Sequence, residues 1–302
     1  MVNARTSRAH AAAKVAEMRR EQERRQRRRT LMVAGGSVAV VLLLALALVG
    51  AKLAGVGSGK SAKTTAAASS LTTSLSSASA GLMSLGAGSS ADPPAQIKAP
   101  VMKADGKPRV LYVGAEYCPF CAAQRWSVAV ALGRFGTWSG LGQTSSSASD
   151  VYPNTPTLSF HGAKLTSSYI SFTGVETTTN QPLAGGGYQA LDSLTSADAA
   201  LVQKYNAAPY VPSGAAGSIP FIDIGGTYVS SGAAFTPQLL ANKTQAQVAA
   251  ALKDPKDPIA QAVGGSANVL TAAVCRVTGG QPAAVCTAPG IQAAATKLGH
   301  AG

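Results

Sequence analysis

Residues 110–122 of the chain read VLYVGAEYCPFCA, and this stretch decides the fold. Its first four residues are a continuous apolar run between a proline and a glycine, which is typical of a strand covered on both faces. Two cysteines follow with two residues between them, and apolar side chains then recur at helical spacing. We predict a buried strand over 110–113, a short loop, and a helix that begins near Pro119 and contains Cys121.

The spacing of Cys118 and Cys121 suits thiol–disulfide chemistry. Two intervening residues bring both sulfur atoms within bonding reach on one helical turn. The first cysteine then lies beside the unpaired N–H groups and the positive dipole end of the helix, which stabilise a thiolate and lower its pKa. We expect Cys118 to be exposed and to attack, and Cys121 to be buried and to resolve the mixed disulfide. The alternative for this pair is a purely structural disulfide.

A second β-rich region follows much later in the chain. Residues 218–224 read SIPFIDI, residues 227–229 read TYV, and Gly225 and Gly226 stand between them. Two such runs around a Gly-Gly pair predict a β-hairpin with a two-residue turn.

The region between the cysteine motif and the hairpin is longer than a simple connection. Residues 136–194 are rich in Gly, Ser and Thr, and we expect an insertion there, with strands over 157–161 and 169–173. A helix is predicted from Thr195 to Tyr205, because a threonine followed three residues later by an acidic residue is a variant of the capping box.

For four residues of the predicted domain, we expect either a solvent-exposed or a core position. We expect Glu116 to lie in solvent, and the alternative is a proton relay to Cys121. We expect Arg125, one turn beyond Cys121, to be exposed, and the alternative is that it adds positive potential near the site. Trp126 is expected in the core. His161 is expected at the surface, because a lone histidine on a strand is more often a surface residue than a catalyst.

The N-terminal part of the chain predicts a membrane anchor. Residues 31–51 contain no charged side chain, and at about 1.5 Å per residue they are long enough to span the hydrocarbon core. Five arginines precede this run within residues 24–29, whereas only Lys52 directly follows it. We therefore place a transmembrane helix at 31–52 of a single-pass plasma-membrane protein, with a cytoplasmic N-terminus and an extracytoplasmic C-terminal domain. A cleaved signal peptide is the alternative.

Composition divides the rest of the chain. Residues 1–30 form a basic cytoplasmic arm, and residues 53–100 are so rich in Ser, Ala and Gly that we expect a flexible linker. Residues 101–302 are long enough for one domain with a full core. The net charge of +13 is concentrated in the arm, where no aromatic residues are interleaved, so we expect no nucleic-acid binding.

A second cysteine pair, Cys275 and Cys286, lies in a C-terminal region that we expect to be mostly helical. All four cysteines follow the predicted anchor, as expected of disulfides in an oxidising compartment. A structural bond between this pair would contribute about 3 kcal/mol. The alternative is a second redox pair that exchanges electrons with Cys118 and Cys121. Zinc is disfavoured because the second pair lacks a Cys-x₂-Cys spacing, and we expect no metal and no cofactor.

Taken together, these residues resemble known proteins. The run 110–113, the CPFC at 118–121 and the Ile-Pro-Phe at 219–221 are similar to the core signature of the thioredoxin superfamily. That resemblance implies an α/β, thioredoxin-like fold with an insertion, and a cis Pro220 that faces the two cysteines and helps to position a substrate chain.

A narrower resemblance covers residues from about 108 to 286. It is carried by EYCPFCA at 116–122, IPF at 219–221 and TGGQP at 278–282, which resemble a membrane-anchored thioredoxin-like group, domain-of-unknown-function family 929. The family name carries no established activity, and CPFC lacks the histidine of strongly oxidising thioredoxin relatives.

The functional prediction is a membrane-tethered, extracytoplasmic thiol–disulfide oxidoreductase. Its catalytic residues would be Cys118, Cys121 and Pro220, and its partners would be exported cysteine-containing proteins or a membrane redox partner. The alternative is a non-catalytic thioredoxin-fold binding module in which both disulfides are structural.

Overall fold

The structure is a computed structural model, and it describes residues 61–88 and 93–298. The predicted cytoplasmic arm, residues 1–30, and the predicted transmembrane helix, residues 31–52, lie outside the described residues. None of the helices in the described part has the length and the apolar character of a membrane-spanning segment. The described part is an α/β fold built on one central mixed sheet.

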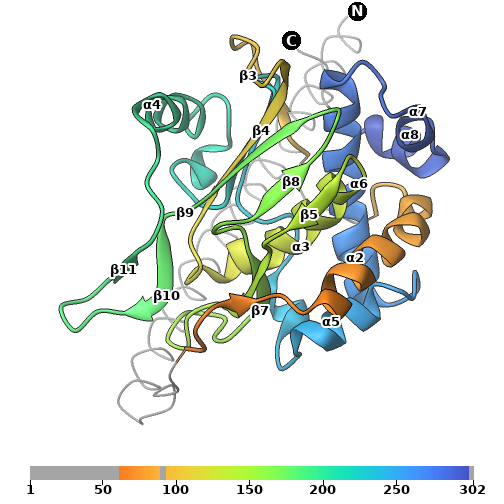
Figure 1. Cartoon of the computed structure of the whole chain (residues 1–302). Helices are drawn as coiled ribbons and strands as arrows, with labels where there is room; N and C mark the ends of the chain where they lie inside the picture. Colours follow the sequence, from red (N-terminus) through yellow and green to blue (C-terminus); the bar gives the residue numbers. More distant parts are fainter. Residues whose placement is uncertain (1–60, 89–92, 299–302) are drawn as a thin grey trace, which may run out of the picture. The chain divides into compact units, whose positions relative to one another are not determined.

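The central sheet is arranged around the strand that leads into the cysteine motif (Figure 1). Its strands are β2 (Ala95–Gln96), β3 (Lys103–Ala104), β4 (Lys107–Gly114), β9 (Ser171–Glu176), β12 (Phe221–Ile224) and β13 (Tyr228–Ser231). Their order is β2, β13, β12, β4, β9, and β3 folds back on the start of β4. β9 is parallel to β4, whereas β12 runs antiparallel to β4 and to β13.

Helices cover both faces of this sheet. They are α3 (Pro119–Gly133) and α6 (Pro258–Val277) on one face and α4 (Ser196–Tyr205) on the other. Successive strand side chains point to opposite faces, so Val110 and Tyr112 join the core with α3 and α6, and Leu111 and Val113 pack with α4. All four side chains are buried, which confirms the predicted strand covered on both faces.

Shorter elements complete the fold. The outer strands are β1 (Thr65–Ala66), β5 (Thr137–Ser139), β6 (Gly142–Ser145), β7 (Pro156–Ser159), β8 (Lys164–Thr166), β10 (Thr178–Pro182) and β11 (Tyr188–Ala190). The outer helices are α2 (Ser69–Leu82), η1 (Met83–Leu85), η2 (Ser213–Ala215), η3 (Pro237–Leu240), α5 (Gln245–Ala251), α7 (Ala283–Cys286) and α8 (Pro289–Ala295). The hairpin β10–β11 projects from the body in Figure 1.

The region predicted as an insertion, 136–194, is only partly one. The strands expected over 157–161 and 169–173 correspond to β7 and β9, but β9 pairs along its length with β4 and belongs to the central sheet. β9 reads SFTGVE and is largely half-buried, because it lies at the edge of the sheet. An edge strand needs few apolar residues, so its composition did not separate it from the surrounding loops.

The predicted hairpin is confirmed as β12–β13, with one correction to its turn. Ile224 pairs with Tyr228, so the loop contains three residues instead of two. Gly225 and Gly226 have φ values of 65° and 70°, which favour glycine. A Cβ on Gly226 would also lie 2.3 Å from the Pro100 carbonyl oxygen, so the backbone approaches too closely for any side chain.

The predicted flexible linker, residues 53–100, is corrected where the structure describes it. Residues 69–82 form α2, which contacts α3, α5 and α6. Its buried residues are Leu71, Leu75, Ala78 and Leu82. They recur at helical spacing, and the Ser- and Ala-rich composition around them hid this apolar stripe. Burial of that stripe in the main core offsets the loss of chain entropy when the segment folds. The average composition of the segment did not predict this burial.

Two glycines show how closely this segment packs against the C-terminal helices. A Cβ on Gly265 of α6 would lie 2.6 Å from the Ala87 carbonyl oxygen. A Cβ on Gly290 of α8 would lie 1.9 Å from the Met83 carbonyl oxygen. The segment that follows α2 is therefore in backbone contact with α6 and α8, and the fold begins well before residue 101.

Candidate redox site

The start of α3 gives the two motif cysteines different surroundings. Cys118 is the N-cap residue and Pro119 occupies the first turn, as predicted from the sequence. The Cys121 N–H donates to Cys118 Sγ at 3.2 Å. The first sulfur thus receives one of the N–H groups that a helix start leaves unpaired, which is the geometry that stabilises a thiolate.

Both cysteines are buried, which corrects one prediction. Cys121 is 0% exposed as expected, but Cys118 is only 5% exposed, although we expected it to be exposed. The loop before β12 covers it, because the Ile219 carbonyl oxygen lies 3.8 Å from Cys118 Sγ. The next peptide bond, Ile219–Pro220, is cis. The structure therefore brings Cys118, Cys121 and the Ile219–Pro220 segment together, although about a hundred residues separate them in sequence.

The electrostatic surroundings move the two thiol pKa values in opposite directions. The pKa of Cys118 is lowered, chiefly by a hydrogen bond from the Cys121 side chain, with burial opposing and backbone N–H groups and Arg125 assisting. The pKa of Cys121 is raised well above its ordinary value, mainly by burial and then by the hydrogen bond between its thiol and Cys118. Cys118 is therefore the sulfur that loses its proton first.

A fully buried ion pair lies behind the motif. Arg125, which we expected in solvent, is 0% exposed, and its Nε and Nη2 donate to the two carboxylate oxygens of Glu176 at 2.8 and 2.6 Å. Burial raises the pKa of Glu176, and the adjacent guanidinium opposes that rise. The prediction for Arg125 was wrong because its partner comes from the end of β9, a strand that local sequence did not place in the sheet.

The ion pair is connected to the cysteine loop by backbone. Arg125 Nη2 also donates to the Ala115 carbonyl oxygen at 2.6 Å, and the same oxygen accepts a hydrogen bond from the Cys118 N–H. The guanidinium thus holds the residue that positions Cys118 while it places a fixed positive charge near both sulfur atoms. This arrangement supplies both rigidity and electrostatic support to the motif.

Glu116 is the second charged residue that the sequence placed wrongly. It is 1% exposed, and its carboxylate accepts hydrogen bonds from Thr64 Oγ1 at 2.8 Å and Ser159 Oγ at 2.6 Å. Both donors belong to segments far away in sequence, so nothing adjacent to Glu116 signalled its burial. Trp126 is in the core as predicted, and His161 is at the surface, where it contacts Asp192.

Aromatic side chains surround the motif, and sequence inspection did not single them out. Tyr117 stacks on Tyr188 of β11 with ring centroids 4.2 Å apart. Phe120, between the two cysteines, makes an edge contact with Tyr152 at 5.8 Å. Both outer rings come from residues 136–194, and isolated tyrosines in a polar segment gave no local signal of this contact.

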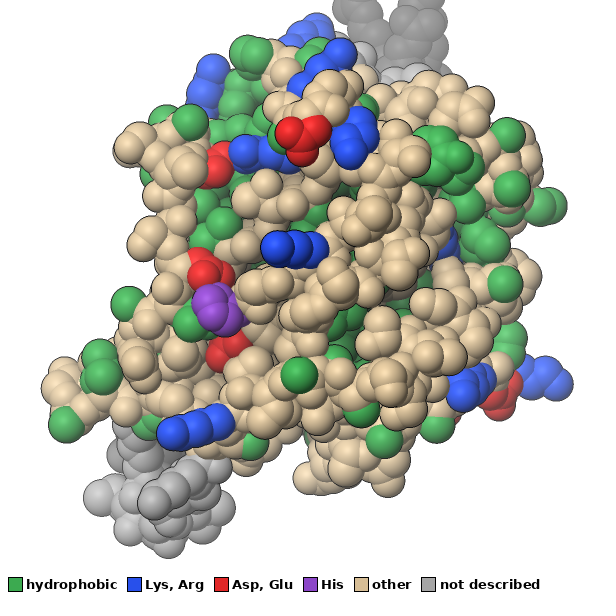
Figure 2. All heavy atoms as spheres, viewed as in Figure 1, with side chains coloured by type: hydrophobic (Ala, Val, Ile, Leu, Met, Phe, Trp, Pro, Cys, Tyr) green, Lys and Arg blue, Asp and Glu red, His purple; other side chains and the backbone are tan. Residues whose placement is uncertain are grey.

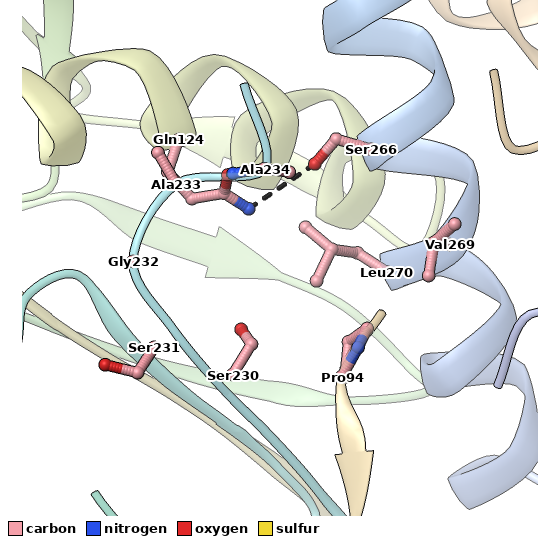
Figure 3. A pocket seen from close by; sticks show the side chains of 10 residues that line it. All are labelled: Pro94, Gln124, Ser230, Ser231, Gly232, Ala233, Ala234, Ser266, Val269 and Leu270. Atoms are coloured by element: carbon pink, nitrogen blue, oxygen red, sulfur yellow. Dashed lines mark hydrogen bonds between the residues drawn. The ribbon is translucent and has the colours of Figure 1, made fainter. Parts of the chain in front are cut away.

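A small cavity between α3, α6 and the end of β13 contains no charged side chain in its lining (Figure 3). Gln124 of α3 lines it together with Ser266 and Leu270 of α6 and the chain after β13. Gln124 Oε1 accepts a hydrogen bond from the Ala234 N–H at 3.0 Å, which ties α3 to the segment following the hairpin. All its lining side chains are neutral, so the cavity offers packing and hydrogen bonds, not acid–base or thiol chemistry.

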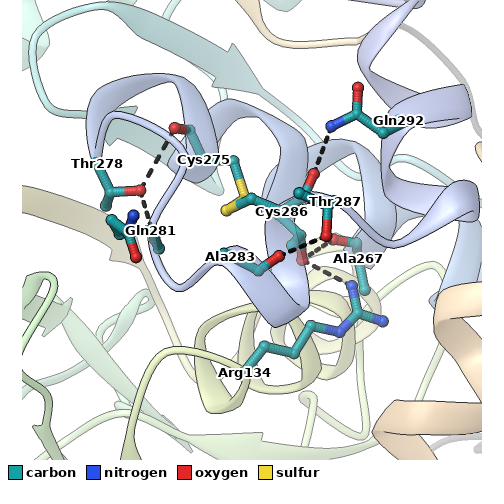
Figure 4. Close-up of a disulfide and its surroundings, with 10 residues drawn as sticks. Arg134, Ala267, Cys275, Thr278, Gln281, Ala283, Cys286, Thr287 and Gln292 are labelled. Atoms are coloured by element: carbon teal, nitrogen blue, oxygen red, sulfur yellow. Dashed lines mark hydrogen bonds between the residues drawn. A yellow bond between two sulfur atoms is a disulfide. The ribbon is translucent and has the colours of Figure 1, made fainter.

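The second cysteine pair forms a disulfide, as expected (Figure 4). Cys275 lies in the last turn of α6 and Cys286 is the last residue of α7, with their Cα atoms 5.6 Å apart. Arg134, just beyond the end of α3, donates to Thr271, one turn before Cys275. Cys121 lies at the other end of α3, about 20 Å along the helix axis at 1.5 Å per residue. This separation favours the structural role over direct exchange between the pairs.

The structure also bears on the zinc alternative. Because Cys275 and Cys286 are bonded to each other, they are not available as thiolate ligands. Across residues 61–88 and 93–298, no group of three or more His, Cys, Asp and Glu side chains is placed to hold a metal ion.

The fold and site define an α/β protein with a cysteine pair at a helix start, opposite a cis-proline loop. A family model described as "Domain of unknown function (DUF929)" matches residues 94–276, which is more than half of the chain. The chain therefore belongs to this family. No curated protein and no solved structure matches this chain.

Proposed function

We propose that the described part of the chain is a thioredoxin-like domain that acts as a thiol–disulfide oxidoreductase. The strand order β13, β12, β4, β9, with only β4 and β9 parallel, supports the fold assignment. So does the position of the motif between β4 and α3. The observation that carries the function is the asymmetry of the pair: Cys118 is the N-cap sulfur with a lowered pKa, and Cys121 is buried with a raised pKa.

The chemistry that suits this asymmetry is a two-step exchange. The Cys118 thiolate attacks one sulfur of a substrate disulfide, forms a mixed disulfide and releases the other substrate sulfur as a thiolate. Cys121 then loses its proton and attacks the Cys118 sulfur, which releases the second substrate thiol and leaves a Cys118–Cys121 disulfide. Two electrons pass from the protein to the substrate, and the reverse sequence oxidises a substrate dithiol.

The cellular setting of the proposal comes from the sequence alone. The uncharged run at 31–51 and the arginines before it support a single-pass anchor with the domain on the outer side of the plasma membrane. The substrates would then be thiols and disulfides of exported proteins, or a redox partner in the membrane. An oxidising compartment also agrees with the Cys275–Cys286 disulfide.

The reduction potential of the Cys118/Cys121 pair tests the function. The full-length chain is equilibrated in thiol buffers of graded potential, alkylated, and analysed by mass for each pair. We expect a two-electron transition at a potential above about −300 mV, the range of labile disulfides, while Cys275–Cys286 stays oxidised as an internal control. If both pairs resist reduction down to that potential, the oxidoreductase is excluded and a binding module with structural disulfides remains.

A further inference from the structure

Two buried hydrogen-bond donors near the cysteine motif have no acceptor. Tyr112 and Arg125 are fully buried, and among the described residues the Tyr112 hydroxyl and Arg125 Nη1 have no hydrogen-bond partner. A buried polar group without a partner costs stability, so such a group needs an explanation. Within the described part of the chain Arg125 is also the only buried lysine or arginine, whereas Figure 2 shows other Lys and Arg side chains at the surface.

The acceptors around these two donors are already occupied. The phenol oxygen lies against Gly114, since a Cβ on that residue would be 2.5 Å from it. The Gly114 carbonyl oxygen accepts from the N–H and the hydroxyl of Thr177, at 2.8 and 3.0 Å. The other nitrogen atoms of Arg125 donate to Glu176 and to the Ala115 carbonyl oxygen. Both donors are therefore fixed in place, with nothing to donate to while the motif is in its thiol state.

Both donors belong to elements that meet at Cys121. Arg125 follows Cys121 by one helical turn, so the two side chains lie on one face of α3. Tyr112 points from β4 into the core that α3 also joins. The electrostatic interactions of Tyr112 and of Arg125 include Cys121 and one another. A negative charge on the Cys121 sulfur would therefore form beside two unpartnered donors.

The second step of the proposed exchange creates that charge. In the thiol state, the Cys121 side chain donates to Cys118. Once Cys118 is bonded to the substrate, Cys121 must give up its proton, although burial raises its pKa well above the ordinary value. Each oxygen of the two buried carboxylates nearby, Glu116 and Glu176, already accepts a hydrogen bond. The site therefore offers donors for a thiolate instead of a free carboxylate base.

We propose that the Tyr112 hydroxyl and Arg125 Nη1 stabilise the Cys121 thiolate when this cysteine resolves the mixed disulfide. We call these two groups the donor pair. The inference rests on the proposed function and assigns residues to its second step. Their partner exists only during that step, which explains why both are unpartnered in the thiol state. Donors that are already fixed where charge develops need no rearrangement during the reaction, so they lower its barrier.

The step balances without a further reactant. The Cys121 proton passes to the substrate thiolate that the first step released. The Cys121 thiolate then attacks Cys118 Sγ and forms the Cys118–Cys121 bond. The bond between Cys118 and the substrate breaks, and its electron pair leaves with the substrate sulfur.

A packing role alone does not explain a tyrosine at position 112. A phenylalanine would keep the edge contact with Phe160, whose ring centroid lies 4.9 Å away, and would avoid burying an unpartnered hydroxyl. It would also remove the oxygen that excludes a side chain at Gly114. Stability of the resting structure therefore favours phenylalanine, and the hydroxyl acts in another state of the site.

Single-turnover kinetics separate the two steps. The reduced full-length chain in lipid nanodiscs is mixed with excess hydroxyethyl disulfide over a range of pH, quenched with acid at graded times and analysed by mass. The mixed disulfide with mercaptoethanol and the Cys118–Cys121 disulfide differ in mass, so both rates are followed directly. The test variant is Tyr112→Phe. Tyr228→Phe is the matched control, because Tyr228 is a buried tyrosine of the same core but lies at the hairpin end of β12, away from the motif.

In Tyr112→Phe, we expect the mixed disulfide to form at the parent rate and to resolve at least about tenfold more slowly, the effect of one lost hydrogen bond to a charged group. Resolution should reach half of its maximal rate at a higher pH than in the parent, because the thiolate has lost a donor. The melting temperature should stay unchanged or rise, since the resting structure loses no hydrogen bond. Arg125→Met/Glu176→Leu should slow both steps, because the guanidinium also favours the Cys118 thiolate. Tyr228→Phe should change neither rate.

Two failures are distinguishable. If the parent chain forms and resolves the mixed disulfide, and Tyr112→Phe does so with the same rates and pH dependence, this inference is overturned. It is also overturned if Tyr228→Phe slows resolution as much as Tyr112→Phe, because any lost core hydroxyl would then have the effect. If the parent chain forms no mixed disulfide with hydroxyethyl disulfide, the proposed function itself fails, whatever the variants do.

Discussion

The two cysteine pairs of this chain lie on neighbouring helices and differ in almost every physical respect. Cys118 and Cys121 are free thiols at the start of α3, beside a buried ion pair and under a loop from a distant part of the chain. Cys275 and Cys286 are bonded to each other at the ends of α6 and α7. The surroundings of the sulfur atoms, more than the presence of two nearby sulfurs, therefore separate a pair suited to exchange from a pair suited to crosslinking.

The electrostatic surroundings of the two pairs also differ. In the first pair, the N-cap position and Arg125 favour a thiolate at Cys118, while burial disfavours one at Cys121. In the second pair, the charged neighbour in sequence, Arg276, is exposed, and none of the ion pairs among the described residues involves a neighbour of the bond. Each of the following predictions perturbs one pair and uses the other as its reference.

The largest expected effect is on exchange itself. Cys118→Ala should reduce disulfide exchange to the uncatalysed rate, because it removes the only sulfur with a lowered pKa. Cys121→Ala should instead accumulate mixed disulfides with partner proteins, because nothing then displaces the substrate from Cys118. Non-reducing gels with and without dithiothreitol show both outcomes. Adducts that form equally well with Cys118→Ala would contradict the assigned roles.

The second-largest expected effect is on the free energy of unfolding, and it comes from the buried ion pair of Arg125 and Glu176. Arg125→Met should lower the free energy of unfolding by about 3–5 kcal/mol, because it leaves the Glu176 carboxylate buried without its partner. The double variant Arg125→Met/Glu176→Leu should recover most of this loss, since two apolar side chains replace two charges. Urea unfolding measures both.

The matched control is Arg276→Met, beside the second pair. Arg276 is exposed, so its replacement should change the stability by less than about 0.5 kcal/mol. A loss of several kcal/mol for Arg276→Met, or none for Arg125→Met, would mean that the buried ion pair does not distinguish the two regions.

Removal of the crosslink is expected to lower the free energy of unfolding less than removal of Arg125 alone. Cys275→Ser/Cys286→Ser should lower the free energy of unfolding by about 3 kcal/mol, the chain-entropy estimate for a loop of this size. Exchange at Cys118 should remain measurable, because the two pairs lie at opposite ends of α3. A double variant that is as stable as the parent but inactive in exchange would instead support a relay between the pairs.

The same comparison shows what sequence could predict. The strand 110–113, the helix from Pro119 and the hairpin after Pro220 were predictable, because each depends on periodicity or turn residues within a short window. The place of Cys118 at the helix start and the burial of Cys121 were likewise predictable from their positions in the motif.

Other parts of the site depend on contacts between distant segments. Arg125 and Glu176 are 51 residues apart, and the cover over Cys118 comes from Ile219. Neither contact leaves a local signal, so Arg125 and Glu116 were expected in solvent and Cys118 was expected to be exposed. α2 was missed for another reason, since its composition resembles a linker and only the spacing of its buried leucines reveals a helix.

The smallest effect is a shift in the pH dependence of alkylation. Iodoacetamide reacts with the thiolate, so the rate at Cys118 should rise with pH and reach half of its maximum below the ordinary thiol pKa of 9.0. Cys121, measured in Cys118→Ala, should react only above that value, because burial raises its pKa. Removing the Arg125 charge in the double variant Arg125→Met/Glu176→Leu should move the Cys118 midpoint upward, since that charge favours the thiolate. The pair 275/286, fully reduced in denaturant, supplies the reference curve for unperturbed thiols. If the Cys118 midpoint coincides with that reference, the helix start and the guanidinium do not activate the sulfur, and the electrostatic difference between the two pairs is lost.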